Sequence, residues 1–198
     1  MKAINEELQN MKSLRVYQSV PFLPPSANLI SSRWIFKYKR NSKGEITKRK
    51  TRLVAKSFTQ RMGIDYHETF SPTLKYDSLR LITALSIHYG FNIEQIDINS
   101  AYLNATLDEN IYMEPPEGHP DHNKNYWKLE KAIYGLKQSG KQWNEELNKY
   151  LINIGFSRLL SEPCIYVKKN KSKKVIGVLG IYVDDILIAD DNSKINKT

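Results

Sequence analysis

VLGIYVDDILIAD, from Val178 to Asp190, is an apolar run with two adjacent carboxylates in its middle. The residues on either side of Asp184-Asp185 are mostly β-branched, which favours strands, whereas Asp favours turns. The stretch therefore predicts a β-hairpin with its tip at the two aspartates. An Asp pair is most often only a polar turn, so its meaning depends on the rest of the chain.

The remaining sequence mixes helical and strand patterns without a regular strand-helix-strand rhythm. Helices are expected over 77–89 and 139–154, since apolar residues recur there at helical spacing and a glycine follows each segment. Strands are expected over 33–40, 46–56, 91–98, 126–131 and, as a pair, within 165–183. This mixture favours an α+β fold with an antiparallel sheet packed on helices.

Length and composition limit the class of protein. With 198 residues, 40% of them hydrophobic, the chain can bury a core and form one or two domains. A formal net charge of +9 favours an anionic partner. The single cysteine, Cys164, excludes an internal disulfide framework and suits a reducing compartment. No stretch approaches the roughly 18 continuous apolar residues of a membrane span, so no membrane partner is expected.

The positive charge is concentrated between Arg33 and Arg61, where Glu45 is the one acid. The motif NSKGE, from Asn41 to Glu45, predicts a turn between two strands, and aromatic residues alternate with basic ones in the first strand. A two-stranded ribbon of this kind is a good surface for phosphate groups, and the alternative is a solvated basic hairpin without a ligand. The basic side chains are Arg33, Lys37, Lys39, Arg40, Lys43, Lys48, Arg49, Lys50, Arg52, Lys56 and Arg61.

Asp97 ends the predicted strand FNIEQIDI, which we expect to be buried. A charged Asp in a buried strand is costly unless it binds a cation, and together with Asp184 and Asp185 it gives three carboxylates near strand ends. Such a set suits Mg²⁺, and two ions about 3.5–4 Å apart form the clamp used in nucleotidyl transfer. Zinc is not expected, because the spacing of the candidate ligands matches no zinc site: His67, His119, His122 and Cys164.

Four ordered motifs resemble the reverse transcriptases of Ty1/copia-type LTR retrotransposons. YVDD, from Tyr182 to Asp185, resembles their polymerase signature. The stretch that begins RWIFKYKRNSKGEITKRKTRLVAK resembles their fingers segment, and QIDINSAYLNATLDENIYMEPPEG resembles the segment with their first catalytic aspartate. KLEKAIYGLKQSGKQW resembles their motif for template and nucleotide contacts. The resemblance extends from about Asn5 to Asp190.

The resemblance implies roles for individual residues. Asp97, Asp184 and Asp185 are the expected catalytic metal ligands, with the backbone carbonyl of Ile98 as a further oxygen. Tyr102 occupies the position of a steric gate that excludes a ribose 2′-OH. The other expected contacts to substrate are Lys50, Arg52, Gly135, Lys137 and Gln138, and those to nucleic acid are Lys48, Arg49 and Tyr182.

The same resemblance implies an activity and partners. The reaction is attack of a primer 3′-hydroxyl on a dNTP with Mg²⁺, or alternatively Mn²⁺, and the partners are an RNA template, a DNA primer, dNTP and the rest of a Pol polyprotein. The implied location is intracellular, in a cytoplasmic virus-like particle or the nucleus. The implied domains are a lead segment (1–30), fingers (31–90 and 106–135) and an incomplete palm (91–105 and 136–198).

The sequence departs from the family pattern at Ser57, Ala105 and Ser139-Gly140, where other small residues or an Ala-Pro pair are usual. The chain also ends at Thr198, soon after YVDD, so the thumb and RNase H domain implied by the family would lie further on. Two hypotheses therefore remain: an RNA-directed DNA polymerase domain, and a truncated, inactive remnant that at most binds nucleic acid.

Overall fold

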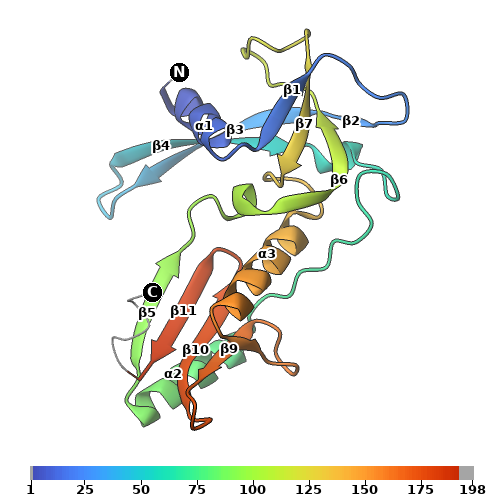
Figure 1. Cartoon of the computed structure of the whole chain (residues 1–198). Coiled ribbons are helices and arrows are strands. Elements are labelled where there is room, and N and C mark those ends of the chain that lie inside the picture. Colours follow the sequence, from blue (N-terminus) through green and yellow to red (C-terminus); the bar gives the residue numbers. More distant parts are fainter. Residues whose placement is uncertain (1, 192–198) are drawn as a thin grey trace. The chain divides into compact units, whose positions relative to one another are not determined.

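The computed structural model describes residues 2–191, which form two compact units. Unit 1 comprises Met1–Phe70 with Tyr102–Trp143, and unit 2 comprises Ser71–Ala101 with Asn144–Thr198. Both units combine helices with sheets in which nearly all strands are antiparallel (Figure 1). The predicted α+β class is thus confirmed. None of the helices in the described residues is long and apolar enough to cross a membrane.

Unit 1 is built around a four-stranded sheet in the order β1-β7-β6-β2. Its central strands pair antiparallel, whereas β2 joins β6 in parallel. The elements are α1 (Lys2–Ser13), β1 (Tyr17–Val20), β2 (Leu29–Ile30), the 3-10 turns η1 (Ser57–Thr59) and η2 (Ala101–Asn104), β6 (Thr106–Met113) and β7 (Tyr126–Lys131).

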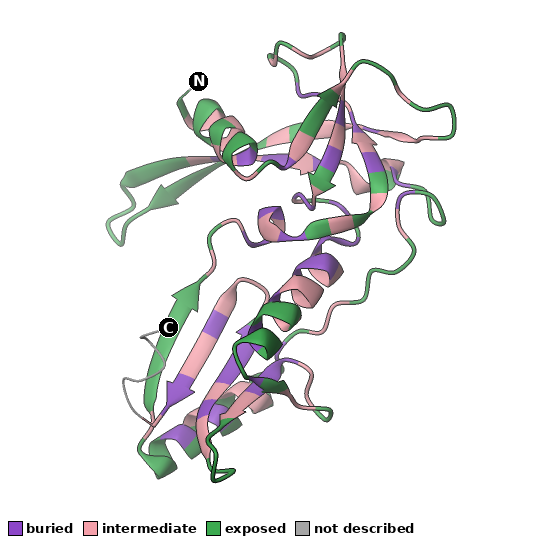
Figure 2. Cartoon of the chain, viewed as in Figure 1, coloured by how far each residue is buried: buried purple, intermediate pink, exposed green. Residues whose placement is uncertain are grey.

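A separate two-stranded ribbon, β3 (Ser32–Arg40) and β4 (Ile46–Ala55), also belongs to unit 1. The inner half of β4 is buried from Thr51 onward at alternate residues, while the outer half is exposed (Figure 2). α1 lies against β4, and the Glu7 carboxylate accepts a hydrogen bond from the backbone N–H of Leu53 at 3.3 Å. The helix therefore anchors the base of the ribbon to the core of the unit.

The core of unit 1 joins these parts. Apolar side chains from α1, β4, β6 and β7 form one buried cluster that includes Met11, Leu53, Ile111, Trp127 and Leu129. Each is less than 3% exposed, so the ribbon base and the sheet share a single core.

Unit 2 contains a five-stranded antiparallel sheet in the order β5-β11-β10-β9-β8. α2 lies against β10, β11 and β5, and Ile82 of α2 is buried in a cluster with Leu74, Cys164, Ile165 and Ala189. The elements are α2 (Tyr76–Tyr89), β5 (Asn92–Asp97), β8 (Ser157–Arg158), β9 (Ile165–Lys169), β10 (Val175–Tyr182) and β11 (Asp185–Asp190); α3 (Ser139–Asn153) begins in unit 1 and ends in unit 2.

Two local expectations need correction. The helix predicted to be capped at Asp77-Ser78 begins earlier, after Lys75, and the Ser78 hydroxyl donates instead to the Glu162 carboxylate at 2.8 Å. Its predicted stop is confirmed, because Gly90 has a φ of 68° and ends α2 in the left-handed conformation.

The strand with Asp97 is also not buried as predicted. All six residues of β5, an edge strand of its sheet, are exposed (Figure 2). A cation at Asp97 is therefore indicated by the neighbouring carboxylates and not by burial of the strand.

The compact units have other bounds than the predicted domains. Residues 2–30 belong to unit 1, and residues 71–90 belong to the unit that holds the YVDD hairpin. The names fingers and palm therefore remain predictions.

Candidate active site

The YVDD motif forms the turn between β10 and β11. These strands pair from Gly177 opposite Asp190 to Tyr182 opposite Asp185, which leaves Val183 and Asp184 as the two turn residues. The predicted hairpin is confirmed, but its tip is one residue earlier than expected, and Asp185 is the first residue of β11. Val183 has a φ of 58°, which costs a β-branched residue about 1–3 kcal/mol.

Asp97 and Asp185 stand opposite each other on the neighbouring strands β5 and β11. The Ile98 N–H donates to the Asp184 carbonyl at 2.8 Å, so the pair of residues beside them is hydrogen-bonded. Because hydrogen-bonded and non-hydrogen-bonded pairs alternate, Asp97 and Asp185 occupy a non-hydrogen-bonded position, where opposed side chains come closest. Two like charges at such a position repel each other, and a cation between them would remove the repulsion.

Gln95 is a neighbour of this pair that the sequence patterns did not single out. It lies two residues before Asp97, on the same face of β5, and its Nε2 donates to Oδ1 of Asp185 at 3.0 Å. The hydrogen bond restricts the Asp185 carboxylate and leaves its other oxygen for a further ligand.

The donor set at the hairpin fits a hard cation. Carboxylate oxygens from Asp97 and Asp185, with Asp184 adjacent in the turn, are the ligands that Mg²⁺ prefers, and Mg²⁺ keeps part of its shell for water or phosphate. Within residues 2–191, however, no three or more His, Cys, Asp or Glu side chains are gathered as a ready metal site. The structure thus brings two of the three predicted carboxylates together and leaves the third in the turn beside them.

The predicted substrate residues lie in unit 1. Lys50 and Arg52 are on β4, on the same face of the ribbon, and both are half-buried. Their charges, with the hydrogen bond from Leu53, favour the ionised form of Glu7, but burial has the larger effect and raises the pKa of Glu7. Tyr102 is in η2, where its carbonyl accepts the N–H of Ala105 at 3.0 Å.

Gly135 has a structural reason to be glycine. Its φ is 92°, and a Cβ on it would lie 2.2 Å from the Ala55 carbonyl oxygen and 2.5 Å from a methyl group of Val54. The loop after β7 can therefore approach β4 only without a side chain here. Close approach to a nascent base pair, the predicted role, remains a prediction.

Gln138 is completely buried in a polar network. Its Nε2 donates to the Asp65 carbonyl at 2.6 Å and to Glu109 at 3.2 Å, and its Oε1 accepts from Gln60 at 3.0 Å. The backbone N–H of Lys137 donates to Gln60 at 2.8 Å. These contacts give Gln138 the role of fixing the loop, so a direct substrate contact remains a prediction.

Lys137 points its ammonium group at Tyr66. The Nζ atom donates to the Tyr66 hydroxyl at 2.9 Å and lies 4.6 Å from the ring centroid. Its side chain is exposed, so it stays accessible to an anion.

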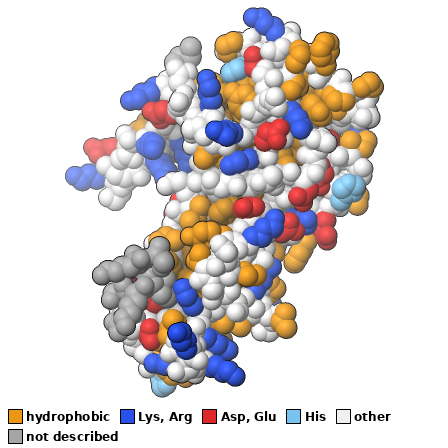
Figure 3. All heavy atoms as spheres, in the orientation of Figure 1, with side chains coloured by type: hydrophobic (Ala, Val, Ile, Leu, Met, Phe, Trp, Pro, Cys, Tyr) orange, Lys and Arg blue, Asp and Glu red, His pale blue; other side chains and the backbone are white. Residues whose placement is uncertain are grey.

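The strand register places the ribbon's cations opposite one another. Lys37 pairs with Lys50, and Lys39 pairs with Lys48, all on one face. The other face carries Phe36 and Tyr38, which are 65% and 54% exposed, and Arg49 opposite Tyr38. Figure 3 shows Lys and Arg side chains gathered over this region. Opposed like charges destabilise a ladder by a few tenths to about 1 kcal/mol, which a polyanion would relieve.

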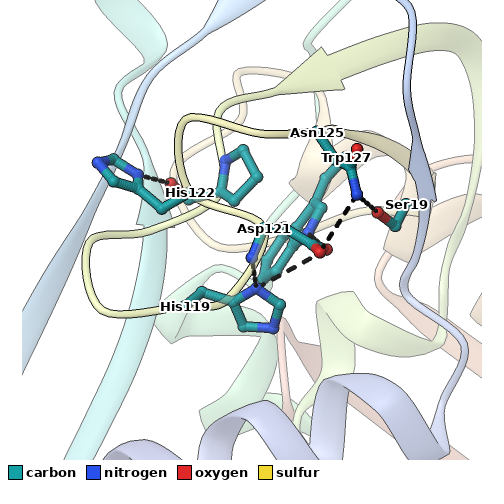
Figure 4. Close-up of polar contacts among 7 residues, drawn as sticks. Ser19, His119, Asp121, His122, Asn125 and Trp127 are labelled. Carbon is teal, nitrogen blue, oxygen red and sulfur yellow. Dashed lines mark hydrogen bonds and ion pairs between the residues drawn. The ribbon is translucent and has the colours of Figure 1, made fainter.

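The loop before β7 carries a second polar cluster, which the sequence patterns did not single out as a unit (Figure 4). Nδ1 of His119 accepts the backbone N–H of Asp121 at 3.1 Å, and Oδ2 of Asp121 accepts Nε1–H of Trp127 at 3.0 Å. Asn125 donates to the Ser19 hydroxyl at 3.1 Å, and His122 donates to the Pro115 carbonyl at 2.7 Å. These bonds tie the loop to β1 and β7.

The titration of this cluster follows from its contacts. Burial lowers the pKa of His119, although the charge of Asp121 acts in the opposite direction. Burial would raise the pKa of Asp121, but hydrogen bonds from Trp127, Ser19 and Asn125, together with the charge of His119, lower it.

Comparison with known families agrees with these features. Residues 15–198 match the family described as reverse transcriptase (RNA-dependent DNA polymerase). The match therefore includes the ribbon, the Asp97 strand and the YVDD hairpin.

Curated relatives are polyproteins of transposons. The chain is 38% identical over 198 residues to the retrovirus-related Pol polyprotein from transposon RE2 of Arabidopsis thaliana, covering 99% of this chain and 14% of that protein. It is 37% identical over 190 residues to the one from transposon TNT 1-94 of Nicotiana tabacum, covering 95% and 14%. The transposon Ty1-BL Gag-Pol polyprotein of Saccharomyces cerevisiae is 32% identical over 170 residues, covering 85% and 9%. The chain thus spans about a seventh or less of the length of these relatives.

Proposed function

The chain belongs to the reverse transcriptase family of Ty1/copia-type retrotransposon Pol polyproteins, and on this premise we propose that it carries the nucleotide-adding site of an RNA-directed DNA polymerase. The observation that carries the proposal is the opposed pair Asp97 and Asp185 beside Asp184. A cation would relieve the repulsion between these two opposed carboxylates, and a divalent cation is what nucleotidyl transfer requires.

Asp97, Asp184, Asp185 and the carbonyl of Ile98 would hold Mg²⁺, or alternatively Mn²⁺. When bound, the ion supplies charge stabilisation for the attacked phosphate. The protein's own part is positioning: the pairing of β5 with β11 sets the separation of Asp97 and Asp185, and the hydrogen bond from Gln95 orients one of them.

The residues of unit 1 would bind the substrates. Lys50 and Arg52 neutralise the triphosphate, and the Tyr102 ring excludes a ribose 2′-OH by steric conflict. Lys137 contributes a further cation, while Gly135 and Gln138 fix the loop beside the substrate and contact the nucleotide from it. Lys48 and Arg49 contact the template and primer, as does Tyr182 of β10 in unit 2.

The ribbon would bind nucleic acid without reading its sequence. Its opposed lysines face phosphates, and the exposed Phe36 and Tyr38 offer rings to unpaired bases. In this proposal residues 31–90 and 106–135 form the fingers, and residues 91–105 and 136–198 form the palm. The partners are an RNA template, a DNA primer, dNTP and the rest of a Pol polyprotein, in a cytoplasmic particle or the nucleus.

A second candidate is a protein that binds nucleic acid without turnover, suggested by the departures at Ala105 and Ser139-Gly140. The structure accommodates two of these residues: Ala105 is completely buried, and the Ser139 hydroxyl donates to the Ile133 carbonyl at 2.5 Å. These residues are therefore compatible with the fold, and the choice between the two candidates depends on activity.

The test places this chain in the Pol polyprotein of the tobacco relative, in place of the matching segment. The chimera should extend a DNA primer on an RNA template with Mg²⁺. Asp184→Asn should lower the rate roughly a thousandfold, which corresponds to about 4 kcal/mol. A chimera that binds template and primer but does not extend, with all three aspartates intact, would establish the second candidate instead.

A further inference from the structure

Tyr134 lies between two of the predicted substrate residues of unit 1. Its ring centroid is 4.2 Å from the guanidinium carbon of Arg52 and 5.1 Å from the ring centroid of Tyr102, with the two rings at 53°. The three side chains come from β4, η2 and the loop after β7. Tyr134 belongs to the motif AIYGLKQ, from Ala132 to Gln138.

The backbone on either side of the Tyr134 ring is fixed. The carbonyl of Tyr134 accepts the N–H of Ala55 at 2.8 Å, and Ala55 lies three residues after Arg52 on β4. The N–H of Ala132 donates to the carbonyl of Ala105 at 2.8 Å, just after η2. The ring is thus anchored to the same two segments that carry Arg52 and Tyr102.

The contact with Tyr134 occupies one face of the Arg52 guanidinium group and leaves its edge to bind an anion. A guanidinium stacked on a ring uses its flat face there and keeps the N–H donors at its edge. Within the described residues, Nε of Arg52 is buried and has no hydrogen-bond partner. Because the Arg52 side chain as a whole is only half-buried, the rest of the guanidinium group is the part that can meet a ligand, and a phosphate oxygen is the acceptor that it binds best.

We propose that Tyr134 is a positioning residue that holds Arg52 for the triphosphate and Tyr102 for the sugar at the same time. The inference rests on the proposed function, since it assumes that Arg52 and Tyr102 meet a nucleotide. It adds that the two contacts depend on one shared ring. Loss of that ring should therefore weaken nucleotide binding and sugar selection together.

The experiment uses the 198-residue chain and three forms of residue 134: the wild type, Tyr134→Phe, which keeps the ring, and Tyr134→Leu, which removes it. NMR detects the Nε–H signal of Arg52, which the ring should shift upfield in the first two proteins and not in the third. Titrations with dATP and with ATP then give the affinity for each sugar. The Leu variant should bind dATP about three- to tenfold more weakly, and its preference for dATP over ATP should shrink, while Phe restores both.

The outcomes separate the two proposals. If Tyr134→Leu has the same affinities for dATP and ATP as the wild type, the role of Tyr134 is refuted and the proposed function is unaffected. A wild-type chain that keeps the upfield Arg52 signal but binds neither nucleotide would refute the proposed nucleotide site itself, and the role of Tyr134 with it. If Tyr134→Leu does not fold, Tyr134→His tests the same point, because its ring is planar but smaller and should give an intermediate affinity.

Discussion

Asp97 and Asp185 stand opposite each other where the β5–β11 ladder brings side chains closest. Without a cation this pair is unfavourable, so a site built to bind metal should cost the fold some stability. Asp185→Asn should therefore raise the stability of the metal-free chain by roughly 0.2–1 kcal/mol. The measurement is urea unfolding in the presence of a chelator.

The same variant should lose the response to magnesium. Mg²⁺ at about ten times its dissociation constant should stabilise the wild type by about 1.4 kcal/mol, because it binds only the folded state, and should leave Asp185→Asn nearly unchanged. Asp77→Asn, at an exposed carboxylate on α2, is the matched control and should keep the full magnesium effect. Equal stabilisation of Asp185→Asn and the wild type would place the magnesium site elsewhere.

Gly135→Ala should destabilise the chain by more than about 2 kcal/mol. The new methyl group would lie 2.2 Å from the Ala55 carbonyl oxygen, and the φ of 92° adds strain for any residue with a Cβ. Gly44→Ala separates the two causes, because Gly44 has a φ of 80° but no atom within 4 Å of the added carbon. It should cost only about 1 kcal/mol, and equal losses in both variants would show that the contact with Ala55 is unimportant.

The local sequence patterns predicted the ribbon and the hairpin but not the pairing between distant strands. The ribbon from Ser32 to Ala55 and the strands around Asp184 are set by alternation and turn residues, which act within a few residues. The opposition of Asp97 and Asp185 depends on β5 choosing β11 as its neighbour, and no local pattern contains that choice.

Exposure and side-chain contacts were also beyond the sequence. FNIEQIDI has the composition of a buried strand, yet β5 lies at an edge and is exposed throughout. Gln95 and Tyr134 gain their importance only from contacts with residues 90 and 82 positions away along the chain, Asp185 and Arg52. For the same reason no local pattern indicated the buried network in which Gln138 lies, and its contact with substrate remains a prediction.

His119 should make the stability of the chain depend on pH below about 6.5, its ordinary pKa. Burial lowers the pKa of His119 in the folded state, so the unfolded chain takes up the proton first as the pH falls. Stability should thus decrease from about pH 6.5 down through the lowered pKa, whereas the effect of Asp121 lies lower, below its ordinary value of 3.8.

Melting temperatures between pH 5 and 8 check this prediction. His119→Gln should flatten the decrease, since glutamine can still accept the Asp121 N–H but does not titrate. His67→Gln, at an exposed histidine, is the control. If the pH dependence of the melting temperature persists in His119→Gln and disappears in His67→Gln, it comes from His67 and the prediction for His119 is wrong.

The opposed lysines of the ribbon should matter for binding and not for folding. Replacing Lys37, Lys39, Lys48 and Lys50 with Gln removes two like-charge pairs and also the favourable charge of Lys50 near Glu7, so stability should change by no more than about 1 kcal/mol. Affinity for an RNA–DNA template–primer should fall, because each lost phosphate contact reduces the dependence of log K on log salt by about one. Fluorescence anisotropy measures the affinity and its salt dependence. The useful range is about 50 to 200 mM salt, where the affinity changes steeply.

A second basic turn gives the matched control for this measurement. The end of β9 and the turn that leads to β10 are also rich in lysine. Replacing Lys169, Lys171, Lys173 and Lys174 with Gln lowers the net charge by the same amount as the ribbon variant does. If the ribbon is the binding surface, this control variant should keep most of the wild-type affinity and salt slope. Equal losses in the two variants would mean that binding follows the net charge of +9 and not the arrangement of β3 and β4.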